Sequence, residues 1–107
     1  MPVDPALAAL YFRVQMAGAS AEQAISFLNQ REVLRGRMAV QSVVLHLTAA
    51  RNRLKDSGQN PERLAYVEQL IVYYSAAMNT ILRPAAAPGV AKSLADNQGN
   101  LYSASPL

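Results

Sequence analysis

Apolar side chains recur at spacings of three and four along the chain, which is the period of an α-helix. The first such stretch follows Asp4 and Pro5, a pair typical of a helix start because the carboxylate can cap free N–H groups and proline's fixed φ suits the first turn. Gly18 is typical of a helix end. We therefore expect a first helix over about residues 5–17, with the apolar positions Leu7, Leu10, Tyr11 and Val14.

A second, longer helix is predicted over about residues 21–55. Ser20 and Gln23 form a capping-box pattern at its start, and proline is absent from there to Lys55. The polar residues around Asn29 shift the apolar face, so a bend or break there is one alternative. Beyond it the apolar positions follow a heptad pattern; they are Val33, Gly36, Val40, Val43, Leu47, Ala50 and Leu54.

A third helix is predicted over residues 61–83, after a short polar turn. Asn60 and Pro61 repeat the cap-and-proline start, and Pro84 ends the pattern. Two helices joined by so short a turn predict an antiparallel α-hairpin. The apolar positions of the third helix are Leu64, Val67, Ile71, Tyr74, Met78 and Ile81.

The last segment, residues 84–107, changes to alanine, proline, serine, glycine and asparagine. Apart from one turn of helix around 90–95, its composition predicts an extended tail that buries too little to order itself. We expect a neighbouring subunit to hold it; the alternative is that it folds back on its own hairpin. The predicted fold is all-α: a helical domain over 1–83, consisting of a long hairpin and a shorter N-terminal helix, with an extended C-terminal arm.

We call the row of apolar positions along each predicted helix its seam. Large apolar side chains also lie outside the seams of the second and third helices, which are expected to pack against each other. They form a second stripe on the second helix, opposite its heptad seam, and another on the third helix. The N-terminal helix can cover one of these faces, and exposed apolar stripes usually mark an interface. The predicted interface residues, including two from the tail, are Leu34, Met38, Leu45, Tyr66, Tyr73, Leu101 and Tyr102.

The composition offers little for catalysis. Among the 107 residues there is no cysteine and one histidine, and the glutamates lie far apart on the predicted layout. A phosphate-binding glycine loop is also absent from the sequence. We therefore expect a protein that is not an enzyme and that needs neither cofactor nor metal.

Two single residues allow alternative interpretations. Gly36 costs a helix about 1 kcal/mol relative to alanine, so either another backbone approaches it closely or it is a tolerated defect. His46 lies beside the heptad seam. It is either a pH-sensitive contact between subunits or a flanking side chain half in water.

The net charge of +3 is unevenly distributed, because the basic excess falls within residues 31–55. These cations are suited to phosphates or to an acidic partner. Aromatic residues do not alternate with them, so we do not expect nucleic acid to be the main ligand. The candidate contact residues are Arg31, Arg35, Arg51 and Arg53.

Neither a membrane-spanning segment nor a secretory signal is predicted. The longest apolar stretch, 38–50, contains polar residues and is shorter than the roughly 20 residues that a spanning helix needs. The N-terminus lacks a basic start and an uninterrupted apolar centre. We expect a soluble or assembly-bound protein that is exported by a non-classical route or belongs to a virion.

One stretch carries a family resemblance. The sequence NPERLAYVEQLIVYYSAAMN, residues 60–79, resembles the second half of type III secretion needle and inner-rod subunits. The resemblance covers about a fifth of the chain and implies a non-enzymatic hairpin subunit packed helically around a conduit. Needle subunits continue their second helix to the C-terminus, whereas this pattern stops at Pro84. The matching positions are Asn60, Pro61, Leu64, Ala65, Tyr74, Ser75 and Asn79.

The sequence thus favours a structural subunit of a multi-subunit assembly, such as a secretion conduit or a phage virion. Its partners are then copies of itself or other subunits, which it contacts through helix faces and the C-terminal arm. Two alternatives stay open. One is a small helical adaptor or chaperone that offers its apolar stripe to one partner, and the other is a basic nucleic-acid-binding module.

Overall fold

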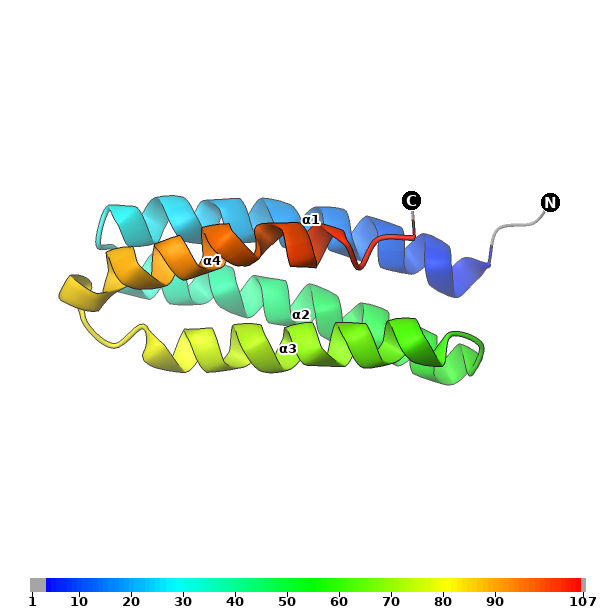
Figure 1. Ribbon diagram of the computed structural model, residues 1–107. Helices are drawn as coiled ribbons and strands as arrows, with labels where there is room; N and C mark the ends of the chain where they lie inside the picture. Colours follow the sequence, from blue (N-terminus) through cyan, green and yellow to red (C-terminus); the bar gives the residue numbers. More distant parts are fainter. Residues whose placement is uncertain (1–3, 107) are drawn as a thin grey trace.

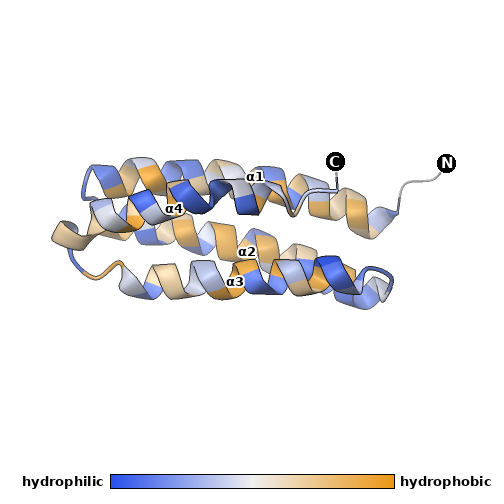
Figure 2. Cartoon of the chain, viewed as in Figure 1, coloured by the Kyte–Doolittle hydropathy of each residue, from blue (hydrophilic) through white to orange (hydrophobic). Residues whose placement is uncertain are grey.

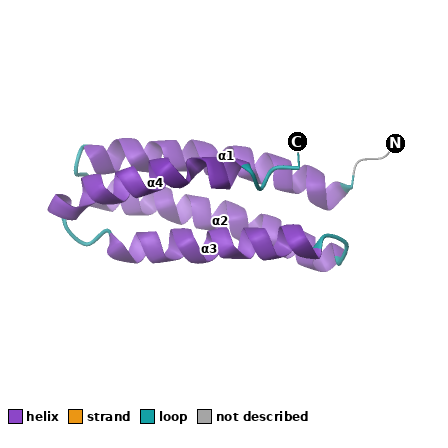
Figure 3. Cartoon of the chain, viewed as in Figure 1, coloured by secondary structure: helices purple, strands orange, loops and turns teal. Residues whose placement is uncertain are grey.

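The computed structural model describes residues 4–106, and every regular element in that range is helical (Figures 1 and 3). The chain runs up and down along a rod whose longest extent is 49 Å, so that consecutive helices are antiparallel. Helix α1 packs against α2 and α4, and α2 packs against α3; α3 and α4 contact each other much less. The elements are α1 (Pro5–Asn29), α2 (Val33–Ser57), α3 (Pro61–Thr80), a 3₁₀ turn η1 (Pro84–Ala86) and α4 (Ala87–Tyr102).

Helix α1 begins as predicted but does not end at Gly18. The Asp4 carboxylate accepts a 2.9 Å hydrogen bond from the backbone N–H of Ala6, which is the expected cap. The helix then continues through Gly18 to Asn29, so the predicted end at residue 17 is wrong. Gly18 serves packing instead, because the ring of Tyr102 lies where a Cβ atom would stand.

The predicted helix over 21–55 is two helices. A three-residue turn separates α1 from α2, at the place where the apolar face shifts, and Arg31 adopts the left-handed conformation there with φ of 60°. The break that was one alternative for the second helix is therefore confirmed. As a consequence, α1 and α2 form an antiparallel pair of equal length, 25 residues each.

Two seams of alternating three- and four-residue spacing meet between α1 and α2. The α2 seam is the predicted heptad, whose members from Gly36 to Leu54 are buried while Val33 is half-buried. Gly36 lies under Leu28, and a Cβ atom there would stand 2.7 Å from Leu28 Cγ, so a side chain of α1, and not a backbone as one alternative had it, occupies the space beside this glycine. The α1 seam consists of Leu10, Val14, Ala17, Ala21, Ala24 and Leu28.

The turn between α2 and α3 contains Gly58, which has φ of 66° and closes α2 in the left-handed conformation. Helix α3 starts at Pro61 as expected, but the Asn60 side chain donates to Asp4 Oδ2 at 3.4 Å rather than capping its own helix. The helix ends at Thr80, three residues before the predicted end, and Ile81 follows in a non-helical conformation with its side chain buried.

The prediction of an extended arm over 84–107 is wrong. Residues 87–102 form α4, which folds back along α1 within the same chain, as the alternative for the tail proposed (Figure 1). Its buried side chains lie on one side of the helix, and Figure 2 shows apolar and polar stretches alternating along it. Composition hid this face because most of its members are small; they are Ala87, Ala91, Leu94 and Leu101, followed by Ala104 beyond the helix end.

Candidate functional site: the outer face of α2

The largest exposed apolar side chains of α2 lie on one face, opposite its buried seam. Leu34 is 72% exposed, Met38 59% and Leu45 61%. Their spacings of four and seven place them along one line of the helix surface, about 16 Å from end to end at 1.5 Å per residue. The outer stripe predicted from the sequence is therefore exposed. We call its three residues, Leu34, Met38 and Leu45, the α2 ridge.

Arginines surround the N-terminal half of the α2 ridge. Arg35 pairs with Glu32 at 3.5 Å and lies over the ring of Phe27, with its guanidinium carbon 5.9 Å from the ring centroid. Arg31, in the turn before α2, and Arg37 are also exposed. Residues 31–37 thus contain three arginines and one carboxylate, which leaves a net positive charge beside the exposed leucines and methionine.

Further cations lie toward the C-terminal end of α2, away from the N-terminal half of the ridge. Arg51 donates to Asn52 at 3.0 Å and lies 3.9 Å from Glu68 of α3, while Arg53 is exposed. Arg35 and Arg53 are about 27 Å apart along the helix at 1.5 Å per residue. The structure therefore does not gather the four predicted contact arginines into one patch. Between Glu32 and Asp56, however, the sequence contains five cations and no carboxylate.

The other predicted interface residues contact parts of the same chain. Tyr66 and Tyr73 are half-buried, and their hydroxyls donate to backbone carbonyls of α4. Leu101 is fully buried, and Tyr102, 36% exposed, lies on Gly18. These four serve an interface within the chain, because the segment that was expected to leave the hairpin folds onto it.

His46 has a partner that the sequence did not indicate. Its Nδ1 lies 3.0 Å from Nη1 of Arg13, across the α1–α2 contact. Since a guanidinium group only donates, Nδ1 accepts and the imidazole is neutral. Burial, and then the charge of Arg13, lowers the pKa of His46 below its ordinary value of 6.5. The half-buried ring is a contact between two helices of one chain.

Two further exposed apolar residues were missed by the sequence analysis. Phe12 and Met16, 65% and 48% exposed, lie one turn apart on the outer side of α1. Both lie within the first helix as it was predicted, and their four-residue spacing was a signal in the sequence that was not used. They face away from the α1 seam, as the α2 ridge faces away from its own.

The described part of the chain has no helix with both the length and the apolarity to cross a lipid bilayer. Tyr74 is buried, and its pKa is raised by burial and by the neighbouring Tyr73 and Tyr102. Comparisons of the chain with protein-family models, with curated proteins and with solved structures found no match.

Proposed function

We propose that this protein is a non-enzymatic subunit that docks on another protein of its assembly through the α2 ridge. The exposure of Leu34, Met38 and Leu45 on one line carries the proposal. Apolar side chains that protrude in a row, rimmed by polar groups, are typical of protein-binding surfaces. The other face of the same helix is filled by α1 and α3, so the ridge is the side that is free for a partner.

The charge around the ridge favours a partner that carries carboxylates. Arg31, Arg35 and Arg37 lie beside it and have one neighbouring carboxylate, Glu32, to share. A second copy docked ridge to ridge in parallel would bring these arginines against their own counterparts, and like charges in contact oppose association. Docked antiparallel, it would place them against residues 38–45, which contain no carboxylate. The chain's own carboxylates are spread along the sequence, in or beside each of the four helices, so a second copy does not offer them in one segment. A different chain with an acidic rim is therefore the favoured occupant.

This proposal narrows the hypotheses that the sequence left open. A subunit of a secretion conduit, which the resemblance of residues 60–79 implies, or of a virion can use the ridge to contact a neighbour of another kind. An adaptor uses the same ridge on a single partner. A nucleic-acid role receives less support, because Arg51 already contacts Glu68, and Arg51 and Arg53 lie far along α2 from Arg31 and Arg35.

Two helical peptides test the chemistry of the ridge. Both carry leucines at spacings of three and four; in one the flanking residues are glutamates and in the other lysines. Fluorescence anisotropy should show that the glutamate peptide binds the natural chain, with an affinity that falls as salt is added. Leu34→Gln with Met38→Gln should weaken this binding at least about tenfold, which corresponds to 1.4 kcal/mol.

Val72→Gln is the matched control, because Val72 is 69% exposed on α3, away from the ridge. It should leave peptide binding unchanged, and circular dichroism should show equal helicity for all three chains. Equal binding of both peptides, or binding that the double substitution leaves intact, would contradict the proposal. Tight, salt-sensitive binding of an oligonucleotide with no binding of the glutamate peptide would favour the nucleic-acid alternative instead.

A further inference from the structure

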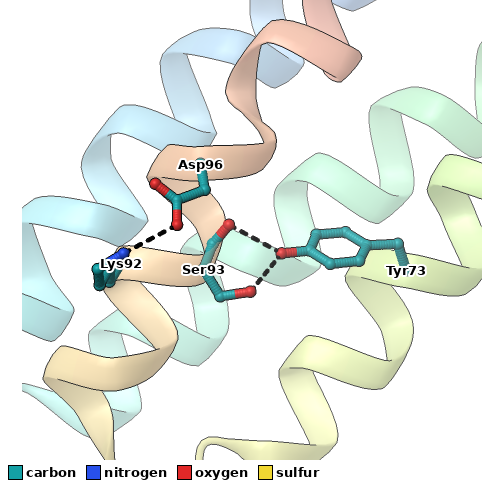
Figure 4. Close-up of polar contacts among 4 residues, drawn as sticks. All are labelled: Tyr73, Lys92, Ser93 and Asp96. Carbon is teal, nitrogen blue, oxygen red and sulfur yellow. Dashed lines mark hydrogen bonds and ion pairs between the residues drawn. The ribbon is translucent and has the colours of Figure 1, made fainter.

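Helix α4 is held to α3 mainly through its backbone. The Tyr66 hydroxyl donates to the carbonyl of Asn100 at 2.8 Å, and the Tyr73 hydroxyl lies 3.0 Å from the carbonyl and 2.7 Å from the hydroxyl of Ser93. Figure 4 shows Tyr73 reaching across from α3 to Ser93, beside the Lys92–Asp96 ion pair of α4. These bonds recognise a helix backbone, which is the same in every copy of the chain.

The C-terminal end of α4 is held in the same way. Arg63 of α3 donates from Nη1 to the carbonyls of Ala104 and Ser105, at 3.2 and 3.3 Å. On the α1 side, Tyr102 fits against Gly18, and Gln98 donates to Glu22 at 3.4 Å. The groove between α1 and α3 that receives α4, which we call the α4 cradle, therefore contacts the segment at defined points from Ser93 to Ser105.

The sequence of α4 does not sustain a helix without this cradle. Gly89 and Gly99 lie within it, and glycine is a poor helix former. Leu94 and Leu101 are the only large side chains it buries. An isolated helix of this length is marginal even with good helix formers. Helix α4 therefore forms when it docks, in whichever cradle it meets.

The contact between α3 and α4 is also imperfectly filled. Tyr74 Oη and Asn97 Oδ1 are buried without a hydrogen-bond partner among the described residues, and such groups weaken a contact. Hollows of about 390 Å³ and 270 Å³ open along the same line, each bordered by Tyr73 and Asn97. Release of α4 is consequently easier than separation of the tightly packed α1 and α2.

The segment before α4 has the features of a hinge. Ile81 and Arg83 are non-helical, and Arg83 is extended with φ of −144° and ψ of 148°. Leu82 between them is 71% exposed and residues 83–85 are exposed as well, whereas the buried Ile81 anchors the start of the segment. Short connections that reverse the chain are the places where proteins exchange elements between copies.

We propose that two copies of this chain exchange α4, so that each α4 occupies the cradle of the other copy. The exchanged dimer uses the contacts already described, with Gly18 of one copy under Tyr102 of the other, and it needs no new surface. The opened hinge, residues 81–86, is the only segment whose conformation changes. This proposal is independent of the α2 ridge, which lies on a different helix.

Cross-linking reports which copy supplies α4, because the chain contains no cysteine of its own. Glu22→Cys with Gln98→Cys places one thiol on α1 and one on α4, at side chains that touch. The concentrated full-length protein is taken briefly to a denaturant concentration that loosens α4, returned to buffer, separated by size and treated with a short bis-maleimide. The dimer fraction should give covalent dimers on a denaturing gel, and the monomer fraction should give internally linked monomers.

Arg13→Cys with His46→Cys is the control pair, because both residues lie in the part that is not exchanged. It should give internally linked single chains from both fractions. Deleting Leu82 and Arg83 shortens the hinge and should make the dimer the major species. The proposal is overturned if the chain stays monomeric after this treatment, or if the dimer of the 22/98 variant links only within single chains. Leu34→Gln with Met38→Gln should leave the exchange unchanged, so failure of the ridge and failure of the exchange are distinguishable.

Discussion

Gly36 and Gly99 are both helical glycines, but they differ in what surrounds them. A Cβ atom at Gly36 would meet the side chain of Leu28, which is fully buried, so that side chain cannot turn into solvent without leaving the core. Among the described residues, none would come within 4 Å of a Cβ atom at Gly99. Local helix propensity favours alanine equally at both positions, so packing alone decides whether replacing each glycine with alanine stabilises or destabilises the protein.

We predict that Gly36→Ala lowers the free energy of unfolding by about 1–3 kcal/mol, as overpacked cores do. Gly99→Ala should raise it by about 0.5–1 kcal/mol, because it restricts the unfolded chain without a clash. Gly18→Ala should cost less than Gly36→Ala, since Tyr102 is partly exposed and its ring can swing outward. Denaturant titration of the three variants measures these differences. A stabilising effect of Gly36→Ala would mean that α1 and α2 do not approach closely at this point.

The contact between Arg13 and His46 predicts a dependence of stability on pH. The folded state lowers the pKa of His46 below 6.5, so the unfolded chain binds the proton more readily. This contribution to stability is present above about pH 6.5 and is lost as the pH falls through the folded pKa. Denaturant titration at about pH 7.5 and 5.5 should therefore show lower stability at the acidic value.

His46→Gln serves as the control for this pH effect, because glutamine still accepts from Arg13 and does not titrate. The variant should lose part of the decrease between the two pH values. Carboxylates titrate mostly below this window, so they contribute the same slope to both chains. An identical decrease in the variant would show that His46 does not contribute.

At the scale of helices, the sequence was most informative where the apolar period is carried by large side chains. The heptad of α2 and the starts at Pro5 and Pro61 follow from local rules, and the structure has them. The end of α1 was misplaced because Gly18 acts through Tyr102, which is remote in the sequence. Helix α4 was missed because its apolar face is mostly alanine and its helix depends on the cradle.

The exposed apolar residues of the candidate site were predicted correctly on α2 but not on α3. Leu34, Met38 and Leu45 were placed on the outer face from the heptad alone, since residues opposite a seam point away from it. The same reasoning placed Tyr66 and Tyr73 on the outside of α3, and there it failed. Whether an outward face stays free depends on what the remainder of the chain covers, and the periodicity of a single helix does not contain that information.

At the scale of the whole molecule, α4 completes a rod that the other three helices leave open. Without residues 84–107, the sides of α1 and α3 that α4 covers would face water, and the buried Tyr74 would lose its cover. Helix α4 is therefore an integral part of the folded core. Its stability is expected to depend on a segment whose composition, taken alone, favours disorder.

We predict that a chain ending at Arg83 unfolds at a lower temperature and over a broader range than the full chain. Removing α4 takes Leu94 and Leu101 out of the core together with three alanines, and loss of one buried leucine alone costs about 2–5 kcal/mol. A synthetic peptide of residues 84–107 should restore the midpoint as its concentration rises, because a ligand that binds only the folded state stabilises it by mass action. A peptide of the same composition in scrambled order should not restore it, since it lacks the spacing of Ala91, Leu94 and Leu101. Thermal unfolding followed by circular dichroism gives both results. An unchanged midpoint after truncation would show that α4 adds nothing to the fold, and equal rescue by the scrambled peptide would show that the cradle does not recognise its sequence.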